Sequence, residues 1–194
     1  MKILRASDHK RMPWKNGGGE TVEIAVYPAR ASIEDFDWRI SMATVASDGP
    51  FSIFADVDRT LSILSGAGME LTIDGGPPVT LELDSEPCPF SADRPVFATL
   101  VDGVTTDLNV MTRRGRFSHR VIRQPVPVSL RPSGFLRFVL ATGKHVIAFG
   151  SQRADLRPLD CLIFGAEVTD DLVISGDSEV FLIELVSEGE SDLR

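Results

Sequence analysis

Residues 13–23 read PWKNGGGETVE, and three consecutive glycines, Gly17, Gly18 and Gly19, lie at the centre of this stretch. Glycine has no Cβ, so it adopts positive φ angles easily and lets other groups approach the backbone, but it loses more entropy on folding than other residues. A run of glycines is therefore unfavourable inside a helix or a strand. It predicts a tight turn before the next strand, which either serves the fold alone or brings the backbone close to a ligand.

The sequence predicts short β-strands separated by turns. Apolar and polar residues alternate in 21–27 and again in 36–45, which is the period of a strand. The apolar members of these two segments are Val22, Ile24, Val26, Trp38, Ile40 and Met42. Turn sequences such as SDGP at 47–50 separate the segments, and no segment keeps a helical apolar stripe for three turns. The pattern predicts an all-β sandwich or barrel.

The strand pattern continues after residues 117–133, FSHRVIRQPVPVSLRPS, which contain Pro125, Pro127 and Pro132 together with repeated basic residues. Proline cannot donate a backbone hydrogen bond to a sheet, so this segment is predicted as a connector between two β units. The expected division is therefore one domain over residues 1–116, a connector over 117–133, and a second, smaller domain over 134–194.

Composition narrows the possible functions. Of the 194 residues 43% are hydrophobic, which is enough for a core, and the formal net charge is −8. An acidic protein repels phosphate backbones, so nucleic acid is not expected as a partner. The N-terminus lacks the apolar run of a signal peptide, and no stretch is apolar enough to span a membrane. We expect a cytoplasmic protein in which Cys88 and Cys161 are buried, reduced thiols.

Four blocks of the sequence resemble the HutD/Ves family. They read PWKNGGGETVEI at 13–24, DWRISMATVASDGPFS at 37–52, DRTLSILSGAGMEL at 58–71 and TDLNVMTRR at 106–114. The resemblance implies a bicupin fold, with two small antiparallel β-barrels of the jelly-roll type in one chain. It also implies a non-catalytic role in histidine utilisation and a small-molecule pocket in the N-terminal barrel.

Metal and nucleophilic chemistry are not expected. The segments in the places of the two metal-binding cupin motifs, 49–71 and 97–114, contain no histidine, and His9, His119 and His145 lie outside both. A transition-metal site needs several converging imidazole, thiolate or carboxylate ligands. No GxSxG elbow or Walker loop occurs either. We therefore predict no metal, no cofactor and no catalytic nucleophile.

Polar residues that share strand faces supply the candidate site. Arg39 and Ser41 lie on one face of their strand, and Asp107 and Asn109 on one face of theirs. If such a face points into a barrel, the arginine needs a carboxylate, which comes from the protein or from a ligand. The alternative is that these faces simply point to water, as is common in antiparallel sheets.

Together, the residues and the resemblance predict a module that binds a small anionic metabolite. The resemblance implies urocanate or a formyl- or formimino-glutamate as the ligand. The predicted ligand-binding residues are Trp14, Asn16, Gly17, Gly18, Gly19, Glu23, Arg39, Ser41, Phe54, Arg59 and Asn109. One alternative is a metal-free cupin isomerase or hydrolase with Glu23 or Asp107 as general base, and another is a structural protein with a vestigial pocket. Exposed edge strands can pair with a second copy of the chain, so a symmetric homodimer is a further alternative.

Overall fold

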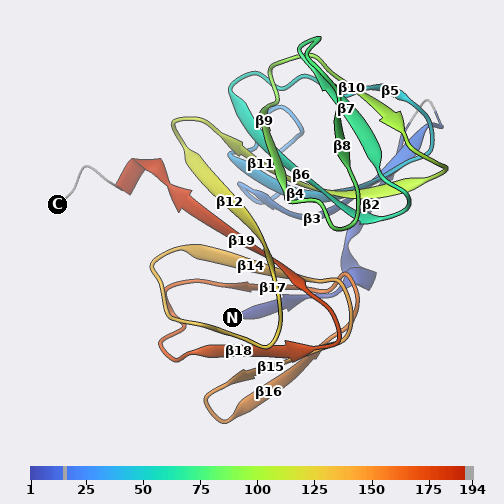
Figure 1. The fold of residues 1–194 in the computed structure, drawn as a ribbon. Coiled ribbons are helices and arrows are strands. Elements are labelled where there is room, and N and C mark those ends of the chain that lie inside the picture. Colours follow the sequence, from blue (N-terminus) through green and yellow to red (C-terminus); the bar gives the residue numbers. More distant parts are fainter. Residues whose placement is uncertain (15–16, 191–194) are drawn as a thin grey trace. The chain divides into compact units, whose positions relative to one another are not determined.

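The computed structural model describes residues 1–14 and 17–190, and the chain in these ranges folds into antiparallel β-strands joined by loops, with two short 3-10 helices (Figure 1). The predicted all-β class is confirmed. The strands group into two compact units, one formed by residues 10–118 with the chain from Ser187 onwards, the other by residues 1–9 and 119–186. No helix within the described ranges has the length and apolar character needed to cross a membrane.

The unit formed by residues 10–118 contains a six-stranded and a four-stranded sheet. The larger sheet has the order β2-β3-β4-β11-β6-β9, with the bounds Lys10–Pro13, Gly19–Tyr27, Trp38–Val45, Thr105–Arg113, Val57–Ser65 and Cys88–Ser91. The smaller has the order β5-β10-β7-β8, with the bounds Gly49–Pro50, Val96–Leu100, Met69–Ile73 and Val79–Leu81. A 3-10 turn, Glu188–Glu190, follows the last strand of the chain.

The two sheets of this unit pack face to face because each presents apolar side chains at alternate positions. Ala43, Val45, Leu61 and Ile63 from the larger sheet form one core cluster with Met69, Leu71, Leu81, Val96 and Ala98. A second cluster contains Phe36, Val57, Ala92 and Met111. This core holds the inner face of the six-stranded sheet in place, and the candidate site lies on that face.

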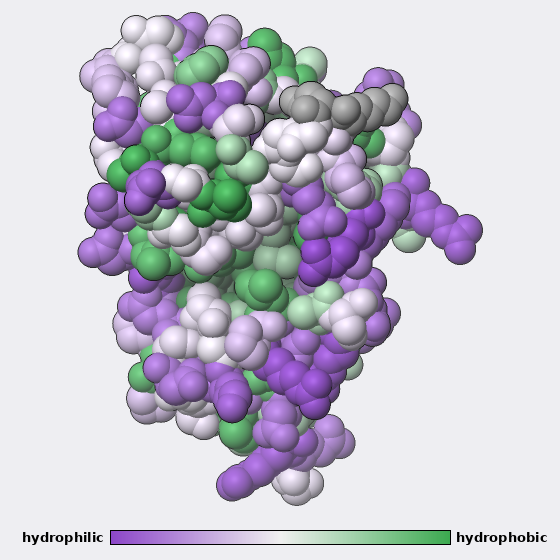
Figure 2. All heavy atoms as spheres, turned by 90° about the vertical axis from the view of Figure 1, so that its right-hand side faces the viewer, coloured by the Kyte–Doolittle hydropathy of each residue, from purple (hydrophilic) through white to green (hydrophobic). Residues whose placement is uncertain are grey.

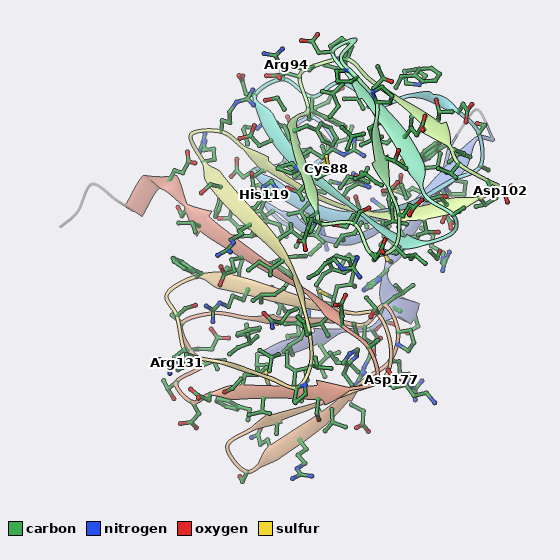
Figure 3. All side chains as sticks on the ribbon, in the orientation of Figure 1. Cys88, Arg94, Asp102, His119, Arg131 and Asp177 are labelled. Atoms are coloured by element: carbon green, nitrogen blue, oxygen red, sulfur yellow. The ribbon has the colours of Figure 1, made fainter. Side chains whose placement is uncertain are left out.

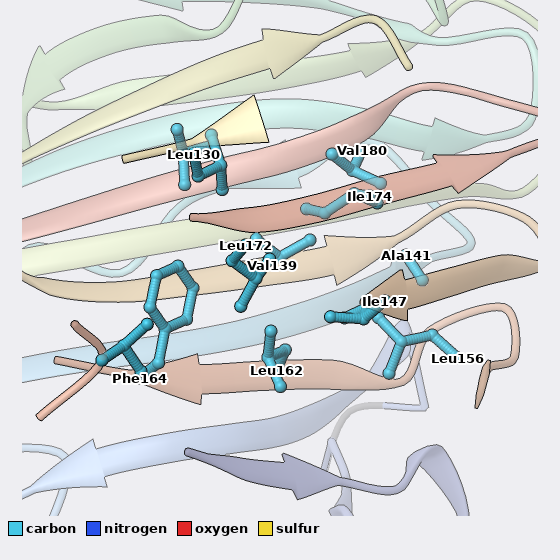
Figure 4. Packing of buried hydrophobic residues seen from close by; sticks show 12 residues of the cluster. Leu130, Val139, Ala141, Ile147, Leu156, Leu162, Phe164, Leu172, Ile174 and Val180 are labelled. Atoms are coloured by element: carbon cyan, nitrogen blue, oxygen red, sulfur yellow. The ribbon is translucent and has the colours of Figure 1, made fainter. Parts of the chain in front are cut away.

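The other unit also contains two sheets. One has the order β1-β17-β14-β19-β12, with the bounds Lys2–Leu4, Cys161–Phe164, Leu136–Ala141, Val180–Ser187 and Phe117–Gln124. The second has the order β13-β18-β15-β16, with the bounds Val128–Leu130, Leu172–Gly176, His145–Phe149 and Gln152–Leu156. A short 3-10 helix, Ala6–Asp8, follows β1. Side chains from both sheets interdigitate in one apolar cluster, in which Val139 and Leu162 meet Ile147 and Leu172 (Figure 4).

The units do not coincide with the domains expected from the sequence. Residues 1–9 belong with the later strands, because β1 pairs with β17 and places Lys2 opposite Ile163. The expected connector, 117–133, contains the strands β12 and β13. Pro125 and Pro127 lie between these two strands, where no ladder hydrogen bond is needed, so prolines mark a turn here and not a whole linker.

Large apolar side chains also reach the surface, as Figure 2 shows for one face of the molecule. Ile53, Phe97 and Val104 are among the most exposed of them. Much of the surface of any folded protein is apolar, so these scattered exposures need no special explanation.

Candidate functional site

A pocket of about 720 Å³ lies in the unit formed by residues 10–118, and its floor is the inner face of the six-stranded sheet. Side chains at every second position of a strand point to the same face. That rule accounts for Thr21 and Glu23 of β3, Arg39, Ser41, Ala43 and Val45 of β4, Arg59 of β6, and Asp107, Asn109 and Met111 of β11. The rest of the lining comes from Lys10, from 12–14, 31–33 and 50–52, and from Phe54.

The register of the sheet arranges the polar residues in rows across the strands. Ser41 lies opposite Glu23 on one side and Asn109 on the other. In the next row Met111 lies opposite both Arg39 and Arg59. Because neighbouring strands are about 4.8 Å apart, the two arginine backbones are roughly 10 Å apart with Met111 between them. The floor therefore carries two cations that one small molecule can span.

Arg39 is buried, with 6% of its surface exposed, and its Nε donates a hydrogen bond of 2.8 Å to Oε2 of Glu23. The sequence required a carboxylate for an inward-facing arginine at this position, and the protein supplies one. Among the residues that the structure describes, neither Nη1 nor Nη2 of Arg39 donates a hydrogen bond to a protein group. The outer edge of this guanidinium is therefore available to an anion.

Arg59 belongs to a buried chain of three polar side chains. Its Nε donates to Oδ1 of Asn109 over 2.8 Å, and its Nη2 donates to the same oxygen. The amide nitrogen of Asn109 in turn donates to Oδ1 of Asp107. Desolvation lowers the pKa of Arg59 to about 10; the nearby Asp107 opposes this shift and Arg39 adds to it. Arg59 thus remains a cation at neutral pH, and its Nη1 has no partner within the described ranges.

Asp107 is fully buried, and burial raises the pKa of its carboxyl group to about 6, although Arg59 and the hydrogen bond from Asn109 lower it. Its Oδ2 has no hydrogen-bond partner among the described residues. A buried carboxylate oxygen without a partner is uncommon, and a carboxyl pKa near neutrality is typical of functional sites.

Aromatic side chains form the walls of the pocket. The ring of Phe51 lies 4.4 Å from the Arg59 guanidinium carbon, which favours a cation–π contact. Trp14 lines the pocket and donates from Nε1 to Oγ1 of Thr21 over 2.8 Å, while Phe54 lines it and packs edge-on against Phe36. Apolar rings beside the guanidinium groups lower the local dielectric, which strengthens the electrostatic interactions of the two arginines.

The glycine run forms the turn that positions Trp14. Gly17 has a φ of 73°, and its N–H donates to the carbonyl of Trp14, whose own N–H donates to the carbonyl of Gly19. A Cβ on Gly19 would lie 2.2 Å from the carbonyl oxygen of Thr44 and 3.0 Å from the Trp14 ring. The close approach expected of these glycines is therefore made to the protein itself, since Gly17, Gly18 and Gly19 do not line the pocket.

Seven of the predicted ligand-binding residues come together in this pocket: Trp14, Glu23, Arg39, Ser41, Phe54, Arg59 and Asn109. Asn16 lies outside the described residues. Sequence reasoning did not include Lys10, Phe51 or Met111, and it named Asp107 only as a possible base. Met111 follows Asn109 by two positions, so the strand period could have found it. Lys10 faces Glu23 through strand pairing, which the sequence does not reveal.

The histidines and cysteines of the chain do not line the pocket. Within residues 1–14 and 17–190, no group of three or more His, Cys, Asp or Glu residues is placed to hold a metal ion. His119 lies on β12, and Cys88 lies on β9 (Figure 3). Both cysteines are free, and burial raises the pKa of each thiol. The prediction of buried thiols fits Cys161, whereas Cys88 is only half-buried.

Comparisons with known proteins agree with the blocks found in the sequence. A family model described as HutD matches residues 6–182. An uncharacterised 21.2 kDa protein of the hutC 3′ region of Pseudomonas putida is 34% identical over 190 residues, which are 96% of this chain and 98% of that protein. Protein Ves of Cronobacter sakazakii is 43% identical over 114 residues, covering 56% of this chain and 60% of the relative.

Solved structures extend this agreement to the fold. HutD of Pseudomonas fluorescens SBW25, solved in a formate condition, is 30% identical with a TM-score of 0.82, covering 96% of this chain and 98% of that one. A cupin 2 conserved barrel domain protein of Leptotrichia buccalis is 11% identical with a TM-score of 0.54 over 91% of this chain and 94% of the other, which speaks for a cupin-like fold alone. On the match of the family model and of these relatives, the chain belongs to the HutD family.

Proposed function

We propose that this protein is a non-catalytic binder of a small anionic metabolite that modulates histidine utilisation. One observation carries the proposal: two buried arginines on the floor of a single pocket have guanidinium nitrogens without an acceptor among the residues that the structure describes. Such donors favour carboxylates, because the planar guanidinium matches two oxygens at once. We also infer that each unit is a cupin-type barrel half of a bicupin, and that the protein acts in the cytoplasm.

The spacing of the cations favours a ligand with two anionic groups. Arg39 and Arg59 lie on either side of Met111, and each has a guanidinium nitrogen with no acceptor in residues 1–14 and 17–190. A formyl- or formimino-glutamate carries two carboxylates on one short chain, whereas urocanate carries one. Ser41, between Glu23 and Asn109, is placed to orient a polar group between the two ends. We therefore favour the glutamate derivatives over urocanate.

This preference gives a direct test by thermal shift. N-formyl-L-glutamate is expected to raise the melting temperature at lower concentration than urocanate, because a ligand that binds only the folded state stabilises it according to its affinity. Losing one of two charge-assisted contacts corresponds to about 10- to 150-fold in affinity. Equal stabilisation by urocanate and N-formyl-L-glutamate would remove the argument for two anionic groups, and stabilisation by neither would remove the proposed function.

Asp107 favours a second candidate function, a metal-free cupin hydrolase or isomerase acting on a small carboxylate. Its pKa of about 6 lies near the working pH of the cell, which suits a general base. Glu23 is less suited to that role because its Oε2 already accepts the hydrogen bond from Arg39. In a hydrolysis, Asp107 would take a proton from water as the oxygen attacks the formyl carbon of N-formyl-L-glutamate. It would pass this proton to the amide nitrogen as the C–N bond breaks, releasing formate and glutamate.

Proton NMR separates the two functions. A hydrolase converts N-formyl-L-glutamate to formate and glutamate over time, and Asp107→Asn should slow that conversion by about 10²- to 10⁴-fold. A binder leaves the spectrum of the ligand unconverted over the same period. We expect no conversion, and turnover that disappears in Asp107→Asn would establish the enzyme instead.

A further inference from the structure

Asp107 is the buried acid of the pocket. On β11 it lies opposite Ala43 of β4 and Ile63 of β6, so its neighbours on both adjacent strands are apolar. Oδ1 accepts from Asn109, while Oδ2 has no acceptor or donor partner in the part of the chain that the structure describes. An ionised carboxylate in such a place depends on a nearby cation for its stability.

Arg59 is the cation on which Asp107 depends. The titratable groups that line the pocket are Lys10, Glu23, Arg39, Arg59 and Asp107, and the lining segments 31–33, 50–52 and Phe54 add none. The smaller sheet contributes the apolar side chains of Met69, Leu71, Leu81, Val96 and Ala98 to the adjoining core. Arg39 forms an ion pair with Glu23, whereas Arg59 is linked to Asp107 by hydrogen bonds through the amide of Asn109.

A ligand carboxylate on the free edge of Arg59 therefore competes with Asp107 for the same positive charge. Two carboxylates that share one cation away from water cannot both remain ionised without a large penalty. The ligand carboxylate is held by the guanidinium, while Oδ2 of Asp107 has nothing to hold it in the charged form. We propose that Asp107 takes up one proton when an anion binds, so that the pocket is specific for an anion that binds together with a proton. This proposal rests on the proposed function.

The direction of the pH dependence follows from the free pocket. Burial raises the pKa of Asp107 to about 6, with Arg59 as the main opposing influence, so the free carboxyl group is mostly ionised above that pH. An anion at Arg59 raises this pKa further, since it adds a like charge and weakens the help from Arg59. Affinity for the anion therefore increases as the pH falls from about 8 to about 6, and it levels off below about 6, where Asp107 is protonated with or without ligand.

Isothermal titration calorimetry with N-formyl-L-glutamate tests this proposal. Both carboxyl groups of this probe have pKa values near 4 and stay ionised from pH 5.5 to 8, so any proton that moves belongs to the protein. Titrations near pH 7 in imidazole and in Tris, which are not anions and whose ionisation heats differ, should reveal uptake of up to one proton per ligand. The affinity should rise about fivefold between pH 8 and pH 6 if the pKa of Asp107 rises by about one unit on binding.

Two carboxylate-to-amide variants in the same pocket identify the group that takes up the proton. Asp107→Asn keeps an oxygen for the Asn109 amide and is permanently neutral, so it should bind without proton uptake, with an affinity at pH 8 about tenfold above that of the parent. Glu23→Gln changes another carboxylate of the pocket and should retain the uptake. Loss of uptake in Glu23→Gln but not in Asp107→Asn would overturn the assignment to Asp107.

The outcomes separate this proposal from the one on which it rests. Binding of N-formyl-L-glutamate with the same heat in both buffers and a flat pH dependence would leave the binding function intact and overturn the proton uptake. No binding at any pH from 5.5 to 8 would overturn both. These measurements on the unmodified protein do not depend on whether either variant folds.

Discussion

Replacement of Arg39 by glutamine is expected to weaken binding of N-formyl-L-glutamate by about 10- to 150-fold, the range of a charge-assisted hydrogen bond at a buried site. Arg39 is 6% exposed and lines the pocket, and its two Nη groups have no acceptor among the described residues. A ligand carboxylate can take both of these donors at once. Arg39→Lys should restore only part of the lost affinity, because an ammonium group lacks the two-pronged geometry.

The control for this change is Arg94→Gln in the same unit. Arg94 is 60% exposed, pairs with Asp74 at the surface (its position is labelled in Figure 3) and does not line the pocket. Surface ion pairs contribute little, so this variant should bind and melt like the parent. If Arg39→Gln bound the ligand as tightly as Arg94→Gln does, the pocket would not be the binding site.

The ion pair with Glu23 also changes what Arg39→Gln should do to the empty protein. If Arg39 were an unpaired buried cation, its removal would stabilise the fold. Arg39 is in fact paired, and the glutamine variant leaves the half-buried Glu23 with a weaker partner. We therefore expect a loss of about 1–3 kcal/mol in the free energy of unfolding, measured by denaturant titration. Glu23→Gln combined with Arg39→Gln should recover part of this loss.

Replacement of Gly19 by alanine is expected to destabilise the protein by about 1–3 kcal/mol, the usual penalty for adding a group where none fits. The new Cβ would lie 2.2 Å from the Thr44 carbonyl oxygen, a backbone atom of the paired strand β4, and 3.0 Å from the Trp14 ring. The strand pairing or the ring must move. Since Trp14 lines the pocket, affinity for N-formyl-L-glutamate should fall as well.

Gly17→Asn is the matched control within the same run. Gly17 has a φ of 73° with open space around the position of a Cβ, and asparagine tolerates left-handed backbone better than most residues. Its free energy of unfolding should stay within about 0.5 kcal/mol of the parent, the range for surface changes. Equal stability of Gly19→Ala and Gly17→Asn in denaturant titrations would contradict the packing described for Gly19.

The fold class could be predicted because it depends on the alternation of apolar and polar residues along each strand. Alternation in 36–45 places Arg39 and Ser41 on one face of a strand, and both do line the pocket. Prolines were a poorer guide. Pro125 and Pro127 fall between two strands, and proline composition alone does not distinguish a turn inside a sheet-forming segment from a linker between domains.

By itself the sequence determined the all-β class, the faces of the strands and seven of the residues that line the pocket, because a period of two and turn chemistry act over a few residues. Only the tertiary structure decided which polar residues meet. Arg59 contacts Asn109 across 50 residues of chain, and Lys2 pairs with Ile163. Such pairings depend on register and on core packing between distant segments, which no local pattern encodes. For the same reason the isolated oxygen of Asp107, buried between β4 and β6, could be found only in the folded chain.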